Sequence, residues 1–263
     1  MSRPVITLLT DYGVGSQHVG ALHAVLARQC PSADRIDFAH DIPAGDARWG
    51  AILLRCLAPE IPGAVHLAVV DPDVGTGRRA VAIELGDGGY AVGPDNGLLG
   101  LLKPVASAAA QLTAEPGRCA TFDGRDLFAP TAARLARGEV LTDIGTVVPV
   151  NSIEEPVVPA AAVRTARLHA AVMGRDRFGN LALAAGEHDV AASGLAIGNT
   201  IRVAGRDAKL GRTFADVSPG GVLVYIDSNA MLSIAVRDGD AAAEFGIAVG
   251  DTVIIERGGA RVA

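Results

Sequence analysis

The sequence predicts an α/β N-terminal domain with a largely parallel sheet, followed by a smaller all-β C-terminal domain that is barrel-like. In the first half, short apolar runs alternate with segments whose apolar residues recur at helical spacing, which is typical of layered α/β proteins. After Val163 the helical segments give way to short apolar runs separated by Gly, Asp and Asn turns, which indicates a barrel or sandwich. We expect domains at residues 1–150 and 163–263 with a linker at 151–162.

The N-terminal half begins with an apolar run, Val5–Leu9, that predicts the first strand. Ser16 can cap a helix that continues to about Gln29, and Asp46 can start another that continues to Leu57. Further strands are expected at 33–38, 65–70, 81–85 and 90–92, the last two forming a hairpin around a glycine-rich turn. Helices are expected at 98–102 and 127–137, with Asp126 as the cap of the second.

The second half is expected to be built from short strands at 170–173, 200–203, 221–226, 231–236 and 252–256. Before them, residues 139–159 are rich in proline and show no regular pattern, which indicates a linker between domains.

Composition excludes several classes of protein. The chain has 263 residues, is 49% hydrophobic and carries a net charge of -6, which argues against a nucleic-acid surface. It contains no apolar run of about 18 residues, and its start lacks the features of a signal peptide. Three widely spaced cysteines favour free thiols in a reducing cytoplasm. Because no Cys-x-x-Cys or His-x-x-x-His spacing occurs, we expect no metal site.

The stretch from Asp71 to Arg79 is the main candidate for a site. An apolar run leads into it, and Pro72 ends that strand because proline cannot donate to a ladder. Asp71 and Arg78 would then lie at the carboxyl end of a strand, where open α/β sheets bind ligands. The alternative is a hairpin loop with solvated charges.

Two further segments carry charged residues. Asp11 follows the first expected strand, where it either binds a ligand or only organises the turn. Asp123 and Arg125 form a second cluster, which could equally be a solvated loop pair. The segment after Asp11 lacks the third glycine of a dinucleotide-binding fingerprint because His18 occupies that position, so an oxidoreductase is disfavoured.

Six motifs occur in order along nearly the whole chain: Thr10-Asp11-Tyr12-Gly13, Val70-Asp71-Pro72 through Arg79, Gly93-Pro94-Asp95-Asn96-Gly97, Phe122 through Pro130, Asp176-Arg177-Phe178-Gly179-Asn180 and Asp227-Ser228. Together they resemble the S-adenosyl-L-methionine (SAM) hydroxide adenosyltransferases. These enzymes are also called SAM hydrolases and are related to fluorinases and chlorinases. The resemblance implies an N-terminal α/β domain and a C-terminal β-barrel.

The resemblance also implies an activity and a set of contacts. Water would displace methionine at the ribose C5′, giving adenosine and L-methionine with no cofactor, in a homotrimer whose sites lie at subunit interfaces. By position, Asp11 would hold the ribose hydroxyls, Phe214 would stack on adenine, Asn180 would hydrogen-bond adenine, Asp176 would meet the methionine ammonium and Ser228 its carboxylate. Asp71 and Arg78 would belong to an Asp-Arg-His group.

This sequence departs from the family pattern at four places. Asp123 stands where the histidine of that group is expected, so it could act as the base, orient water, or suppress turnover by crowding Asp71. The other departures are Asp73 in place of a glycine, Leu183-Ala184 in place of Thr-Asn, and Asn229 where halogenases carry an arginine near the methionine carboxylate.

Three alternatives to hydrolysis remain at this stage. The protein could bind SAM or a nucleoside with little turnover, and formation of adenosine would distinguish an enzyme from such a binder. Chloride or another halide could replace water as the nucleophile, although an anion beside Asp71 and Asp123 is electrostatically unfavourable. An oxidoreductase is the third.

Overall fold

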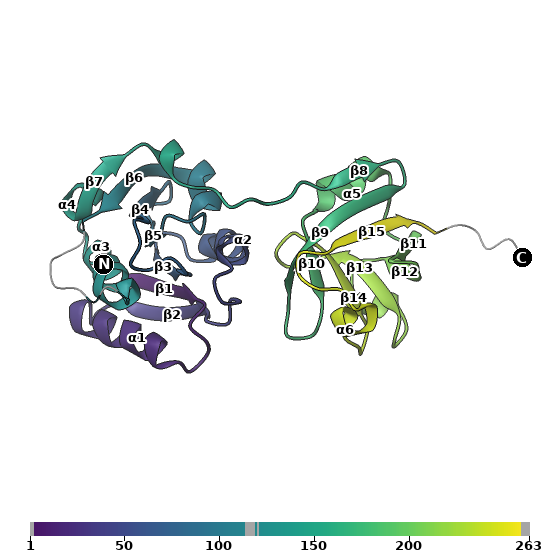
Figure 1. The fold of residues 1–263 in the computed structure, drawn as a ribbon, viewed down its shortest axis with the longest axis horizontal. Helices are drawn as coiled ribbons and strands as arrows, with labels where there is room; N and C mark the ends of the chain where they lie inside the picture. Colours follow the sequence, from purple (N-terminus) through teal and green to yellow (C-terminus); the bar gives the residue numbers. More distant parts are fainter. Residues whose placement is uncertain (1–2, 114–118, 120, 259–263) are drawn as a thin grey trace, which may run out of the picture. The chain divides into compact units, whose positions relative to one another are not determined.

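The chain divides into two compact units, Met1–Val157 and Val158–Ala263, which Figure 1 draws in sequence colours. The structure is a computed structural model and describes residues 3–113, 119 and 121–258. Each unit has its own sheet, so the two are described separately.

The N-terminal unit contains a seven-stranded sheet in the order β2-β1-β3-β5-β4-β6-β7. Its strands are β1 (Val5–Thr10), β2 (Asp34–Ala39), β3 (Val65–Val69), β4 (Ala80–Leu85), β5 (Tyr90–Pro94), β6 (Ala106–Leu112) and β7 (Gly145–Val148). The pairings β1–β2, β1–β3 and β3–β5 are parallel, whereas β5–β4, β4–β6 and β6–β7 are antiparallel. The α/β class is confirmed, and the sheet is mixed because the β4–β5 hairpin reverses its direction.

Helices cover this sheet on both faces (Figure 1). They are α1 (Gln17–Gln29), α2 (Ala47–Leu57), α3 (Ala129–Ala136), α4 (Leu141–Ile144) and the short turns η1 (Ala58–Glu60), η2 (Gly100–Val105), η3 (Gly124–Phe128) and η4 (Val150–Ser152). Helices α1 and α3 share one apolar core around Leu22, Leu26 and Phe128. Helix α2 faces Leu9 and Val70.

Two of the three predicted helix caps are confirmed. Ser16 Oγ accepts a hydrogen bond from the His18 N–H at 3.2 Å, and Asp46 Oδ1 accepts one from the Trp49 N–H at 2.9 Å. The cap at Asp126 is wrong, because the π-helical turn η3 leads into α3 and no side chain of the described residues caps α3. Asp126 instead accepts from the Cys119 N–H at 2.9 Å.

The stretch expected to be an irregular linker is largely part of the N-terminal unit. Residues 141–148 form α4 and the edge strand β7, which pairs with β6 before the first proline at 149 interrupts it. Beyond it, Ile153 is buried, and the Glu154 N–H donates to Asp95 Oδ1 at 2.8 Å. The prediction from proline content that irregular structure begins at residue 139 is therefore wrong, and the N-terminal unit continues to Val157.

The C-terminal unit is a closed barrel, as predicted. Its elements are β8 (Ala162–Arg164), β9 (Arg167–Arg175), β10 (Leu181–Leu183), α5 (Glu187–Ser193), β11 (Thr200–Val203), β12 (Arg206–Leu210), η5 (Phe214–Asp216), β13 (Val222–Ile226), β14 (Leu232–Val236), α6 (Ala241–Phe245) and β15 (Thr252–Arg257). Seven strands follow the order β10-β14-β13-β12-β11-β15-β9, and a β9–β10 pairing closes the ring. Strand β8 extends it beyond β9.

Within the described part of the chain, no helix is long and apolar enough to cross a bilayer. None of Cys30, Cys56 and Cys119 forms a disulfide bond within the described residues.

One buried histidine makes the N-terminal unit sensitive to acid. His66 in β3 has no exposed surface, and its Nδ1 lies 2.8 Å from Thr7 Oγ1. Burial lowers the pKa of the His66 imidazole to about 4. The unfolded chain therefore binds a proton that the folded chain rejects as the pH falls from about 6.5 towards 4, so stability is lost across that window.

We expect a shift from pH 7 to pH 4.5 to cost the wild type about 2–3 kcal/mol more than the His66→Gln variant, since glutamine does not titrate. Urea unfolding of the N-terminal unit at both pH values measures this difference. An identical loss in both proteins would show that His66 does not cause it.

Candidate active site

Two loops at the carboxyl edge of the sheet carry Asp11, Asp71 and Arg78, three of the four candidate residues of the N-terminal unit. Asp11 directly follows β1, and Asp71 comes two residues after the end of β3, which is parallel to β1. The carboxyl ends of parallel strands meet at one edge, so both carboxylates lie where α/β sheets bind ligands. Arg78 lies two residues before β4, at the end of the turn that begins at Asp71, and its side chain contacts Asp71.

Arg78 is clamped between two aspartates. Its Nε and Nη2 donate to Asp71 Oδ1 and Oδ2 at 3.1 and 2.5 Å, and Nη2 also donates to Asp123 Oδ2 at 2.9 Å. Its Nη1 donates to the Arg79 carbonyl oxygen at 2.9 Å. The three side chains of this cluster, Asp71, Arg78 and Asp123, are only 5–7% exposed. A hairpin with solvated charges is therefore excluded.

The cluster holds two carboxylates and one guanidinium. Burial raises the pKa of the Asp71 carboxyl, Arg78 opposes this shift, and the nearby Asp123 adds to it. The ring of Phe128 lies 5.4 Å from the Arg78 guanidinium and closes its other side. Three acceptor groups and an aromatic ring hold the guanidinium, which makes Arg78 a rigid part of the site.

A cavity of about 340 Å³ opens beside this cluster. Its lining comprises Asp11, Tyr12, His18, Asp71, Val74, Thr121, Phe122, Asp123 and Gly124. Asp11 is anchored there because its Oδ2 accepts from the Gly45 N–H at 2.9 Å. The structure thus brings Asp11, Asp71 and Asp123 together around one space.

Two further residues of the cavity were not singled out from the sequence. Burial, followed by Asp11, Asp71 and Asp123, raises the pKa of the Tyr12 phenol, so this group stays protonated and can donate a hydrogen bond. A Cβ atom at Gly124 would lie 2.3 Å from Tyr12 Oη, so only glycine permits this approach.

The second is His18, from the first turn of α1. Its ring lies 5.0 Å from the Phe122 ring and 5.5 Å from the Tyr12 ring, and its Nδ1 lies 3.2 Å from Ser16 Oγ. It is an imidazole on the wall of a cavity that contains three carboxylates. The only sign of His18 in the sequence is its position seven residues after Asp11, where it replaces the third glycine of a dinucleotide-binding fingerprint.

The remaining candidates lie in the C-terminal unit. Asp176 Oδ1 accepts from the Phe178 and Asn180 N–H groups, both at 2.9 Å, and its Oδ2 accepts from Asn180 Nδ2 at 2.8 Å. The ring of Phe214 is 41% exposed and lies 5.4 Å from the Tyr225 ring. Burial, followed by the charges of Asp227 and Asp176, raises the pKa of the Tyr225 phenol.

Ser228 and Asn229 occupy the turn between β13 and β14. Asp227 organises that turn, since its Oδ1 accepts from the Asn229 N–H at 2.8 Å and from the Met231 N–H at 3.0 Å. Ser228 is exposed. The roles implied for these C-terminal residues remain predictions, and Tyr225 joins them as a neighbour that the sequence did not reveal.

Comparison with known proteins gives matches for both units. Residues 6–145 match the SAM hydroxide adenosyltransferase N-terminal domain, and residues 170–254 match the C-terminal domain. The (R)-S-adenosyl-L-methionine hydrolase of Salinispora arenicola is 42% identical over 264 residues, covering 98% of this chain and 99% of the relative. The protein of the same name from Thermus thermophilus is 38% identical, covering 94% and 97%.

A solved structure of an uncharacterized conserved protein from Thermotoga maritima has 31% identity and a TM-score of 0.88, covering 96% of this chain and all of that one. With both domain matches in their expected order and relatives aligned over nearly their whole length, the chain belongs to the SAM hydroxide adenosyltransferase family.

Proposed function

We propose that the protein hydrolyses SAM to adenosine and L-methionine by attack of water at the ribose C5′. The names of the Salinispora and Thermus relatives support this reaction. The observation that carries the proposal is the cavity lined by Asp11, Asp71 and Asp123, of which the last two are held by Arg78. No separate cofactor is proposed, because SAM itself is the substrate.

The charge of the cavity suits a cationic substrate and a neutral nucleophile. The carboxylates of Asp11, Asp71 and Asp123 line the cavity. Because the Arg78 guanidinium, which bonds Asp71 and Asp123, offsets only one of these charges, the site carries net negative charge. A sulfonium is attracted to such a site, whereas a halide ion is repelled. This balance favours water over chloride.

The reaction itself needs little from the protein beyond positioning. The water oxygen forms a bond to C5′ while the C5′–S bond breaks. The electron pair of the broken C5′–S bond stays on sulfur, which becomes the neutral thioether of methionine. Because the sulfonium is a good leaving group, no acid is required to expel it. Holding water in line with the breaking bond can supply about 7–11 kcal/mol of the barrier.

We further propose that His18, rather than Asp123, accepts the proton from water. Asp123 Oδ2 is engaged by Arg78 at 2.9 Å, and its role is to fix that guanidinium. His18 shares the cavity, and with Nδ1–H donating to Ser16 Oγ its Nε2 would present a lone pair. A positioned base of this kind contributes about 10²–10⁴-fold to the rate.

Incubation of the pure protein with SAM in ¹⁸O-labelled water tests the reaction. We expect adenosine that carries the label on its 5′-oxygen, with equal amounts in the presence and absence of a chelator. Unlabelled adenosine, or none, would show that water is not the nucleophile. A protein that only binds SAM would show increased thermal stability without product.

Adenosine binding tests the role of Asp11. The Asp11→Asn variant keeps an oxygen for the Gly45 N–H but removes the charge offered to the ribose hydroxyls. Because a hydrogen bond to a charged group contributes about 1.5–3 kcal/mol, we expect adenosine affinity to fall about tenfold or more by calorimetry. Asp41→Asn, at a nearby exposed carboxylate, is the control and should leave affinity unchanged. Equal affinities would remove Asp11 from the site.

Two finer features belong to the same proposal. We propose a homotrimer, as the resemblance implies, which sedimentation equilibrium would test against a monomer. We also propose a cytoplasmic location, since none of the three cysteines, all of them within the described residues, is in a disulfide bond.

A further inference from the structure

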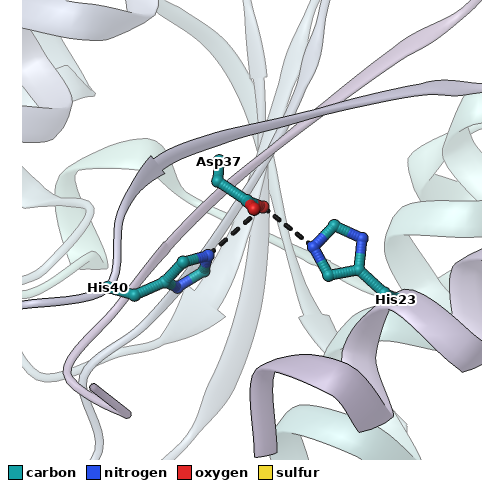
Figure 2. A group of neighbouring side chains, drawn as sticks. All are labelled: His23, Asp37 and His40. Atoms are coloured by element: carbon teal, nitrogen blue, oxygen red, sulfur yellow. Dashed lines mark hydrogen bonds and ion pairs between the residues drawn. The ribbon is translucent and has the colours of Figure 1, made fainter. Parts of the chain in front are cut away.

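A second group of polar side chains lies outside the cavity, at the end of β2 (Figure 2). His23 projects from α1, Asp37 belongs to β2, and His40 follows β2 directly. Nε2 of His23 lies 2.9 Å from Asp37 Oδ1, and Nε2 of His40 lies 3.2 Å from the same oxygen. The three atoms that could ligate a metal all lie within 4.8 Å of one another.

His40 shows that this group is more than a surface ion pair. The residue is only 6% exposed, and its Nε2 is buried with no aligned hydrogen-bond partner among the described residues. The 3.2 Å approach to Asp37 is therefore a close contact with poor hydrogen-bond geometry. A buried polar nitrogen without a well-aligned hydrogen bond lowers the stability of the fold. Because His40 Nε2 lies close to His23 and Asp37, this nitrogen indicates that a further partner binds among the three side chains.

We infer that His23, Asp37 and His40 form a binding site for a divalent transition-metal ion of the zinc class. Zinc binds histidine nitrogen and carboxylate oxygen at about 2.0–2.2 Å, so neighbouring ligands in a tetrahedron lie about 3.3–3.5 Å apart. The two contacts to Asp37, at 2.9 and 3.2 Å, need to open only slightly to admit the ion. Two imidazoles argue against magnesium or calcium, which prefer oxygen.

The surroundings fit a metal site with one open position. The side chains of His23 and Asp37 are 32% and 47% exposed, so an ion can enter from solvent and retain a water as its fourth ligand. On the buried side, His40 Nδ1 lies 2.8 Å from Thr10 Oγ1. With Nδ1–H donating to Thr10, the ring is held with its Nε2 lone pair directed at the ion, which is how outer partners orient metal-binding histidines.

The same contacts connect the metal site to the loop that carries Asp11. Thr10 Oγ1 also accepts from the Tyr12 N–H at 3.2 Å, and the His40 carbonyl oxygen accepts from the Gly13 N–H at 2.7 Å. A bound ion would therefore join α1 to β2 and stiffen this loop. Its role is structural, and it takes no part in cleaving SAM, so the inference does not rest on the proposed reaction.

Calorimetric titration of chelator-treated protein with Zn²⁺ tests the inference. We expect one ion per chain, a higher melting temperature with Zn²⁺ than without, and visible absorption typical of tetrahedral Co²⁺ when cobalt replaces zinc. Neither His23→Gln nor Asp37→Asn alters a buried side chain, and each should lower the affinity at least about tenfold. Thr10→Val should weaken binding about 10–100-fold through the orientation of His40.

Two controls exclude other ligands. His188→Gln alters an exposed histidine in α5, and Cys119→Ser removes an exposed thiol, so both should bind zinc as the wild type does. Absence of 1:1 binding would mean that the three residues form only a hydrogen-bonded cluster. Binding that survives both His23→Gln and Asp37→Asn would place the ion elsewhere. Either result overturns the inference, whether or not the protein hydrolyses SAM.

Discussion

Replacing Arg78 with methionine should cost about 3–5 kcal/mol of folding stability at pH 8, because it leaves two buried carboxylates without their cation. Both Asp71 and Asp123 are bonded directly to Arg78, and their side chains are 5% exposed. Burial already raises the pKa of the Asp71 carboxyl and Arg78 opposes that shift, so without the guanidinium the pKa of Asp71 would rise further above its unfolded value. The destabilisation should therefore be greatest at pH 8 and shrink as the pH falls towards 5.

Arg125→Met is the matched control for this experiment. Arg125 also bonds an aspartate, Asp126, but its side chain is 41% exposed, so the loss should stay within about 1 kcal/mol. Urea unfolding at pH 5 and pH 8 measures both variants. If they lose the same stability, Arg78 is not a buried counterion. A variant that also carries Asp71→Asn and Asp123→Asn should regain part of the loss, since no buried charge remains.

The second large effect concerns turnover. His18→Phe retains a ring against Phe122 and Tyr12 but removes the nitrogen that would accept the proton from water. We expect the single-turnover rate of SAM cleavage to fall by about 10²–10⁴, with KM nearly unchanged. Asp123→Asn should change the rate less than about tenfold, because the proposed role of Asp123 is to hold Arg78.

A double variant sharpens this test. Asp123→His restores the Asp-Arg-His group that the family resemblance implies, so it should recover turnover in the His18→Phe background. If instead Asp123→Asn causes the large loss and His18→Phe does not, Asp123 is the base. Equal rates in the wild type and in all these variants would remove both residues from water activation.

Local sequence patterns predicted most of the fold. Ser16 and Asp46 were recognised because a cap and its helix lie within a few residues of each other. The prediction that Asp126 caps a helix was wrong because Asp126 accepts from the Cys119 N–H, seven residues earlier, and because the turn before α3 is π-helical. Neither feature can be recognised from the residues next to Asp126. The hairpin of β4 with β5 was predicted locally, but the antiparallel pairing of β4 with β6 could not be, because it is set by the tertiary fold.

The candidate site shows the same division. Asp71 and Arg78 lie seven residues apart, and the proline and two glycines between them predict the turn that brings the two side chains together. His18 enters the cavity from a helix, and no motif in its own segment distinguishes it from a surface histidine. The proposed metal ligands come from α1 (His23), β2 (Asp37) and the loop directly after β2 (His40), so no short spacing could reveal all three together.

The triplet of Asp71, Arg78 and Asp123 also constrains how this sequence can diverge. A substitution of Arg78 leaves two buried carboxylates without their cation, whereas a substitution of either aspartate still leaves the guanidinium one carboxylate partner. Because Asp71 accepts two bonds from Arg78 and Asp123 only one, position 123 should vary first and position 78 only after both aspartates are gone. Asp123 in place of the histidine that the family resemblance implies is a step that this order permits. Lineages that keep Arg78 can exchange the residue beside it without passing through an unstable intermediate.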